Sequence, residues 1–139
     1  MGYFKDAQEV YETIGRLHVD LSRDDALLPR YQRANTIVQF VHRNPDAVIT
    51  TRLLEGSAGR VDFGPTDMEP EVVLTLDADV AHRFWLGRLN ATIALARGQI
   101  RAKGPVAKLL RLLPAARPIF IRYRAQLEAQ GRVDLLADD

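Results

Sequence analysis

Four short runs rich in β-branched residues follow one another in the first half of the chain, and they constrain the fold more than any other feature. The runs are TIVQFVH (36–42), VITTRLLE (48–55), RVDF (60–63) and VVLTL (72–76). The connections between them are rich in Gly, Pro and Asp, which favour turns. Short connections between consecutive strands predict an antiparallel meander.

A helical pattern precedes these runs. Segment 3–22 carries apolar residues at spacings of three and four, including Val10, Ile14 and Leu17. This periodicity predicts an amphipathic helix of about five turns.

The pattern changes again after the fourth run. Asp77 and Asp79 stand before VAHRFWLG, where either side chain can cap a helix. QIRAK (99–103) alternates and predicts a fifth strand, and Pro105 lies where the first residue of the next helix is expected. We therefore expect an α+β fold, with a mainly antiparallel five-stranded sheet covered by helices.

Length and composition fit one globular domain over residues 1–139, ending in a helical tail over residues 115–131. The 47% hydrophobic content includes no apolar run near the roughly 20 residues of a membrane span. The first residues lack a signal-peptide core. The absence of cysteine excludes disulfides and thiolate chemistry, and together these features predict a cytoplasmic protein.

Charge is distributed unevenly along the chain. From residue 80 to residue 127 there are ten Lys and Arg residues and no Asp or Glu, so the remainder of the chain is acidic. The asymmetry favours an anionic partner for the second half. The alternative is that the two halves pack together and neutralise each other.

Residue types that carry catalysis are sparse. His18, His42 and His82 lack the spacing of paired metal ligands. Ser22 and Ser57 do not sit in a nucleophile elbow. The sequence therefore predicts no catalytic residue, no metal site and no cofactor.

The basic stretch GQIRAKGPVAKLLRLLP (98–114) has three candidate roles. It lacks the Lys-Ser/Thr pair of a phosphate-binding loop, and Pro105 removes one of the backbone amides that such a loop uses. A nucleic-acid surface is disfavoured, because the nearby aromatic residues lie on apolar stripes. The remaining role is part of an apolar pocket.

More large apolar side chains surround the fifth strand than one face of a small sheet needs, so we expect some of them to line a cavity for an apolar ligand. The candidates are Phe84, Trp85, Ile93, Leu95, Ile100, Leu109, Leu110, Leu113, Ile119, Phe120 and Tyr123. The candidates for contact with an anionic head group, or with an anionic membrane surface, are Arg97, Arg101, Lys103 and Lys108.

FWLGRLNATIALARGQIRAKGPVAKLLRLLP (84–114) resembles the signature region of the type-two sterol carrier protein family, with Gly87, Gly98, Ile100 and Gly104 at matching places. The match is best over residues 33–114. The resemblance implies an apolar tunnel between sheet and helices that holds fatty acids, acyl-CoA esters, sterols or other lipids, and it carries over no catalytic residue. For this chain, an acyl or isoprenoid lipid is favoured over a sterol.

Two classes of function follow. The first is a non-catalytic lipid-binding or lipid-carrier module. The second is an interaction module that keeps the fold with a filled tunnel, such as an accessory subunit in lipid or quinone metabolism, in which Trp85 and Phe120 are large enough to do the filling.

Overall fold

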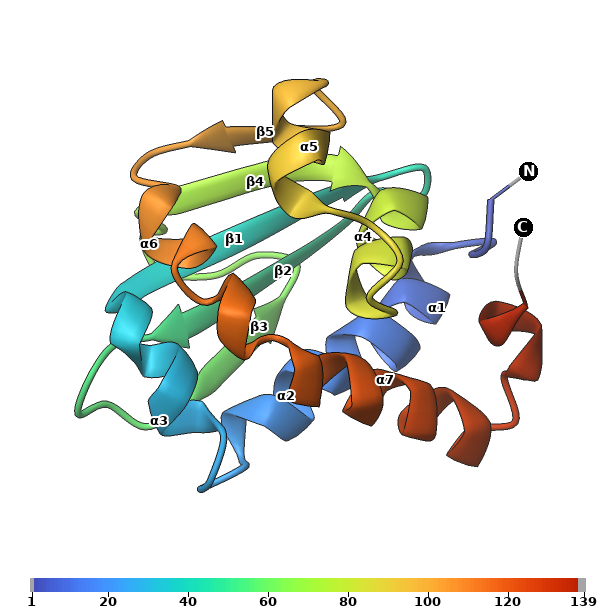
Figure 1. Ribbon diagram of the computed structural model, residues 1–139, viewed down its shortest axis with the longest axis horizontal. Coiled ribbons are helices and arrows are strands. Elements are labelled where there is room, and N and C mark those ends of the chain that lie inside the picture. The colour runs from blue at the N-terminus through green and yellow to red at the C-terminus, as the bar shows by residue number, and fades with distance from the viewer. Residues whose placement is uncertain (1, 138–139) are drawn as a thin grey trace.

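The computed structural model describes residues 2–137, which form a five-stranded sheet with helices packed against it (Figure 1). The strands run in the spatial order β3-β2-β1-β4-β5. Their bounds are β1 Thr36–Arg43, β2 Ala47–Leu53, β3 Arg60–Phe63, β4 Val72–Asp77 and β5 Ile100–Lys103. All five strands were predicted from the sequence, and their ends differ from the expected ones by at most two residues.

The sheet is mixed, so the prediction of a mainly antiparallel meander is wrong at the fourth strand. β1, β2 and β3 pair antiparallel as expected, but β4 pairs parallel with β1, with Val38 opposite Val72. Residues 64–71 carry the chain from the end of β3 back to the start of β1, and Glu71 N–H donates to the carbonyl of Ile37. A loop of this length is long enough for such a return.

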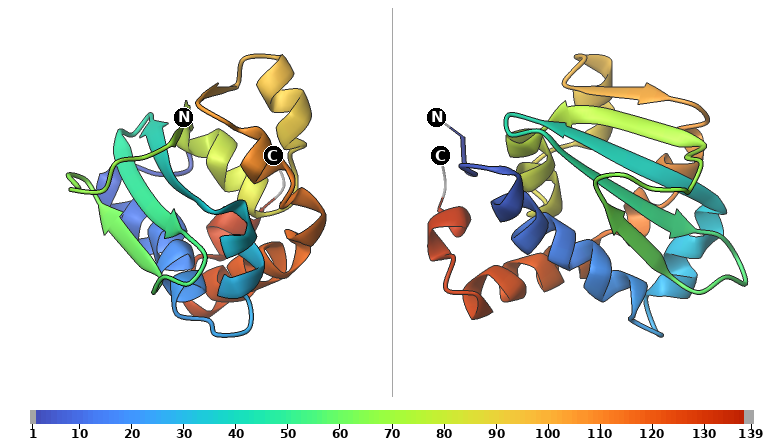
Figure 2. Two further views of the ribbon diagram at one scale, coloured as in Figure 1. Left: turned by 90° about the vertical axis from the view of Figure 1, so that its left-hand side faces the viewer. Right: turned by 180° about the vertical axis from the view of Figure 1, so that it is seen from behind.

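The helices lie on one side of the sheet (Figures 1 and 2). The N-terminal ones are α1 Ala7–Val10, the π turn η1 Tyr11–Gly15, α2 Arg16–Ser22, α3 Leu28–Tyr31 and η2 Gln32–Ala34. The later ones are α4 Ala78–Trp85, α5 Ala91–Ala96, α6 Ala107–Leu110, η3 Leu113–Ala115, α7 Arg117–Ala129 and η4 Val133–Leu136. The predicted N-terminal helix is thus present over residues 7–22, with a wider turn in its middle.

Two details of the second half differ from expectation. Asp77 occupies the N-cap position of α4, yet its carboxylate accepts a hydrogen bond from Asn44 Nδ2 at 3.0 Å instead of capping the helix. The carboxylate of Asp79 accepts from the backbone N–H of Tyr3 at 2.9 Å. Pro105 precedes the N-cap residue Val106 of α6, so it lies two residues before the helix begins.

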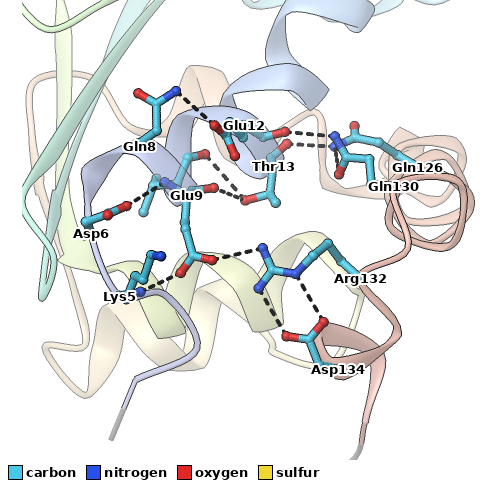
Figure 3. Close-up of polar contacts among 11 residues, drawn as sticks. Lys5, Asp6, Gln8, Glu9, Glu12, Thr13, Gln126, Gln130, Arg132 and Asp134 are labelled. Atoms are coloured by element: carbon cyan, nitrogen blue, oxygen red, sulfur yellow. Dashed lines mark hydrogen bonds and ion pairs between the residues drawn. The ribbon is translucent and has the colours of Figure 1, made fainter.

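α7 is attached to the N-terminal helix through the π turn (Figure 3). A π turn changes the i→i−4 pairing of a helix and leaves backbone carbonyls that need other donors. Gln126 Nε2 donates to the carbonyl of Thr13, and Gln130 Nε2 donates to that of Glu12, both at 2.9 Å. The Arg132 guanidinium adds an ion pair with Glu9 at 3.0 Å.

His82 is a buried link between three elements. Its Nδ1 lies 2.9 Å from the hydroxyl of Tyr123 on α7, and its Nε2 lies 2.8 Å from the carbonyl of Leu135 in η4. Both ring nitrogens are therefore used in holding α4, α7 and η4 together, which gives His82 a structural role.

Candidate ligand-binding cavity

An apolar cavity of about 150 Å³ lies between the inner face of the sheet and the helices. Val38 and Phe40 of β1 and Leu74 and Leu76 of β4 form the middle of its sheet side. These residues share one face because side chains two positions apart on a strand point the same way. We expected a tunnel at this place; residues 2–137 enclose a cavity there and show no tunnel.

Eight of the eleven sequence-predicted ligand residues line the cavity: Phe84, Trp85, Leu95, Ile100, Leu109, Leu110, Leu113 and Ile119. The other three lie elsewhere. Ile93 is 48% exposed, Phe120 packs its ring against the ring of Phe84, and Tyr123 is fully buried beside His82.

None of the four predicted head-group residues lines the cavity. Arg97, Arg101 and Lys103 are exposed, and within residues 2–137 they form no ion pair. Lys108 Nζ pairs with the Glu71 carboxylate at 2.9 Å. That carboxylate also accepts a hydrogen bond from the Thr36 hydroxyl. The hydrogen bond from Thr36, and secondly that from Lys108, hold the pKa of Glu71 below its usual value.

The uneven charge of the sequence is only partly neutralised by contact between the two halves. Lys108 pairs with Glu71, and Arg122 pairs with Asp24. Arg97, Arg101 and Lys103 stay unpaired by any acid of residues 2–137, so packing of the two halves neutralises only part of the basic charge, and the anionic partner stays a prediction.

Much of the wall comes from the first half of the chain, which sequence reasoning did not assign to a site. His18 and Leu21 of α2, Tyr31 of α3 and Thr51 of β2 contribute to it. The available signal was the alternation of Val38 with Phe40, and of Leu74 with Leu76, which places these side chains on the covered face of the sheet.

The polar residues of the wall are few. The Tyr31 hydroxyl donates to the carbonyl of Ala115 at 2.9 Å, and the Ser22 hydroxyl donates to the carbonyl of Val19 at 2.6 Å. Burial, and then the nearby His42, lowers the pKa of His18 from 6.5 to about 3, so its ring is neutral. Among residues 2–137, no Asp, Glu, Lys or Arg lines the cavity.

Such a wall suits the binding of an apolar group and offers no paired acid and base for a reaction. No group of three or more His, Asp or Glu residues that could hold a metal occurs in the part of the chain that the structure describes. Over the same residues, no helix is long and apolar enough to span a bilayer.

Several solved structures with a similar fold are sterol carrier proteins. The sterol carrier protein domain 2 of Helicoverpa armigera superposes with a TM-score of 0.65 at 20% identity, covering 86% of this chain and 94% of that one. A conserved hypothetical protein of Thermus thermophilus, described as possibly a sterol carrier protein, gives a TM-score of 0.63 at 18% identity, covering 91% and 92%.

A third similar structure, UbiJ-SCP2, is described as a ubiquinone synthesis protein; it gives a TM-score of 0.54 at 17% identity and covers 76% of this chain and 85% of that one. No protein-family model and no curated protein matches the chain. At these identities the likenesses show the fold, which is that of the type-two sterol carrier proteins, as the sequence predicted.

Proposed function

We propose that this chain, with its sterol-carrier-type fold, binds or carries an apolar lipid in the cavity without catalysing a reaction. The observation that carries the proposal is the cavity itself, whose wall is apolar apart from His18, Ser22, Tyr31 and Thr51. Burying apolar surface is the dominant favourable term in such binding.

The volume of the cavity limits the size of the ligand that it can hold without rearrangement. A cavity of about 150 Å³ is comparable to an engineered cavity that takes one benzene ring, and pockets for larger ligands measure about 300–1,000 Å³. A long lipid therefore has to displace part of the wall. The wall elements best suited to this are α6 and η3, which are four and three residues long and whose leucines Leu109, Leu110 and Leu113 are only partly buried.

The proposal is tested with straight-chain fatty acids of increasing length. Each buried methylene contributes about 0.8 kcal/mol, so four fewer carbons should weaken binding by about 3 kcal/mol. Replacing one exposed basic residue, as in Arg101→Ser, should weaken it far less. Affinity that does not depend on chain length would overturn the proposal.

The small cavity also favours a second candidate function, an interaction module whose cavity binds no lipid. Similarity in fold to UbiJ-SCP2, a ubiquinone synthesis protein, is consistent with an accessory role of this kind. Native mass spectrometry of the protein purified from its own host separates the two candidates. A co-purifying lipid supports the carrier, and its absence together with no binding in the chain-length series supports the interaction module.

A further inference from the structure

His18 is the most deeply buried polar side chain of the cavity wall that lacks a hydrogen bond. Its side chain extends from α2 and the residue is 5% exposed. The ring is held between two aromatic neighbours, with centroid distances of 5.1 Å to Trp85 and 4.9 Å to Phe40. Packing from both rings fixes the imidazole in the wall.

The Nε2 atom of this ring is buried and has no hydrogen-bond partner within residues 2–137. Roughly 90% or more of buried polar groups in folded proteins are paired, because leaving one unpaired is costly. The hydroxyls of Ser22 and Tyr31 donate to backbone carbonyls, and neither lies within hydrogen-bonding distance of His18 Nε2. Because His18 is one of the residues that line the cavity, a ligand that displaces part of the wall can bring a polar group to this atom.

We infer that the cavity takes an uncharged lipid whose hydroxyl or carbonyl group hydrogen-bonds to the His18 ring, an inference that rests on the proposed function. A neutral imidazole donates through one nitrogen and accepts through the other, according to its tautomer, so both ligand groups fit. His18 thus determines which polar end the cavity accepts.

The charge of the wall supports an uncharged ligand end. Among the described residues no basic side chain lines the cavity, so a carboxylate or phosphate inside it would lose its water without gaining a counter-charge. The low pKa of His18, about 3, keeps the ring from becoming that counter-charge at neutral pH. An anionic head group belongs outside the cavity.

Binding of octan-1-ol and octanoate at neutral pH tests the inference on wild type and three variants. His18→Leu removes the hydrogen-bonding ring, and His18→Gln keeps a group that can donate and accept. His42→Leu is the matched control, because His42 is also buried with an unpaired Nε2 but does not line the cavity.

We expect His18→Leu to bind octan-1-ol about three- to tenfold more weakly than wild type, the loss of one hydrogen bond. His18→Gln should recover most of that affinity, and His42→Leu should bind octan-1-ol like wild type. Octanoate should bind wild type at least about tenfold more weakly than octan-1-ol does. Octan-1-ol should also move the ¹⁵N resonances of the His18 ring.

Each failure has its own signature. If wild type and His18→Leu bind octan-1-ol with equal affinity, and the ligand does not shift the ¹⁵N resonances of the His18 ring, the role of His18 is overturned. The proposed function stays intact in that case if affinity still depends on chain length. Octanoate binding as tightly as octan-1-ol would overturn the preference for an uncharged end. No binding of any alcohol or acid would overturn the proposed function and this inference together.

Discussion

The imidazole ring of His18 and the indole ring of Trp85 meet edge to face in the wall of the apolar cavity, at an interplanar angle of 87°. Trp85 is the sole tryptophan of the chain, so its fluorescence reports on this wall alone. We expect an apolar ligand to change the emission of Trp85 in a saturable way. Trp85→Phe should lose that signal, and a residual change in this variant would place the signal elsewhere.

Stability should fall as the pH is lowered below about 6.5. Burial lowers the pKa of His18 to about 3 and that of His42 to about 4, so the folded state binds fewer protons than the unfolded state over that range. Their contribution to stability is complete above the unfolded pKa and is lost as pH falls toward the folded one. Each histidine should lower the free energy of unfolding by about 2 kcal/mol as the pH falls from about 7 to about 5.

Urea unfolding at both pH values measures this loss. His18→Leu and His42→Leu should each show a smaller difference between the two pH values than wild type does. A variant that loses as much stability as wild type would show that the replaced histidine does not take up its proton on unfolding.

Gly104 should tolerate no side chain. Its φ is 92°, and a β-carbon there would overlap the backbone carbonyl of Glu71. Gly104→Val should lower the free energy of unfolding by about 1–3 kcal/mol. Gly56→Val is the control, because Gly56 also has a positive φ but open space around it. Equal losses in both variants would mean that the contact with Glu71 adds nothing.

Arg101 and Lys103 should promote binding to anionic vesicles. Both are exposed on the edge strand β5, on the face opposite Ile100, which lines the cavity. Basic residues near an anionic bilayer attract it, and salt screens such attraction beyond about 8–10 Å. Vesicle co-sedimentation should therefore fall several-fold from low to high salt, and fall again in an Arg101→Ser, Lys103→Ser double variant.

The control for that double variant is Arg23→Ser, Arg43→Ser, which removes the same charge from exposed positions outside the basic half. If both double variants bind anionic vesicles equally, net charge alone determines the attraction. Equal binding of wild type to neutral and anionic vesicles would exclude any electrostatic contribution.

The strands were predictable from the sequence because alternation and turn residues are local signals, whereas the partner of β4 is not a local property. Val72 of β4 pairs with Val38 of β1 because the loop 64–71 carries the chain past β2 and β1. The composition of that loop does not indicate which path it takes. The cavity residues of the second half could be predicted because many large apolar side chains lie close together in the sequence on either side of the fifth strand. His18 was not, because a lone histidine on an apolar helix face is indistinguishable in sequence from an ordinary core residue.

The π turn at Tyr11–Gly15 determines the direction in which the side chains of α2 point around the helix axis. One residue corresponds to about 100° of rotation around a helix axis. If the same residues wound as a uniform α-helix without the wider turn, α2 would be rotated by about that angle relative to α1. His18 and Leu21, which now line the cavity, would then rotate out of its wall while Val10 kept its place. The π turn accommodates one more residue than an α turn, and the direction in which His18 and Leu21 point depends on it.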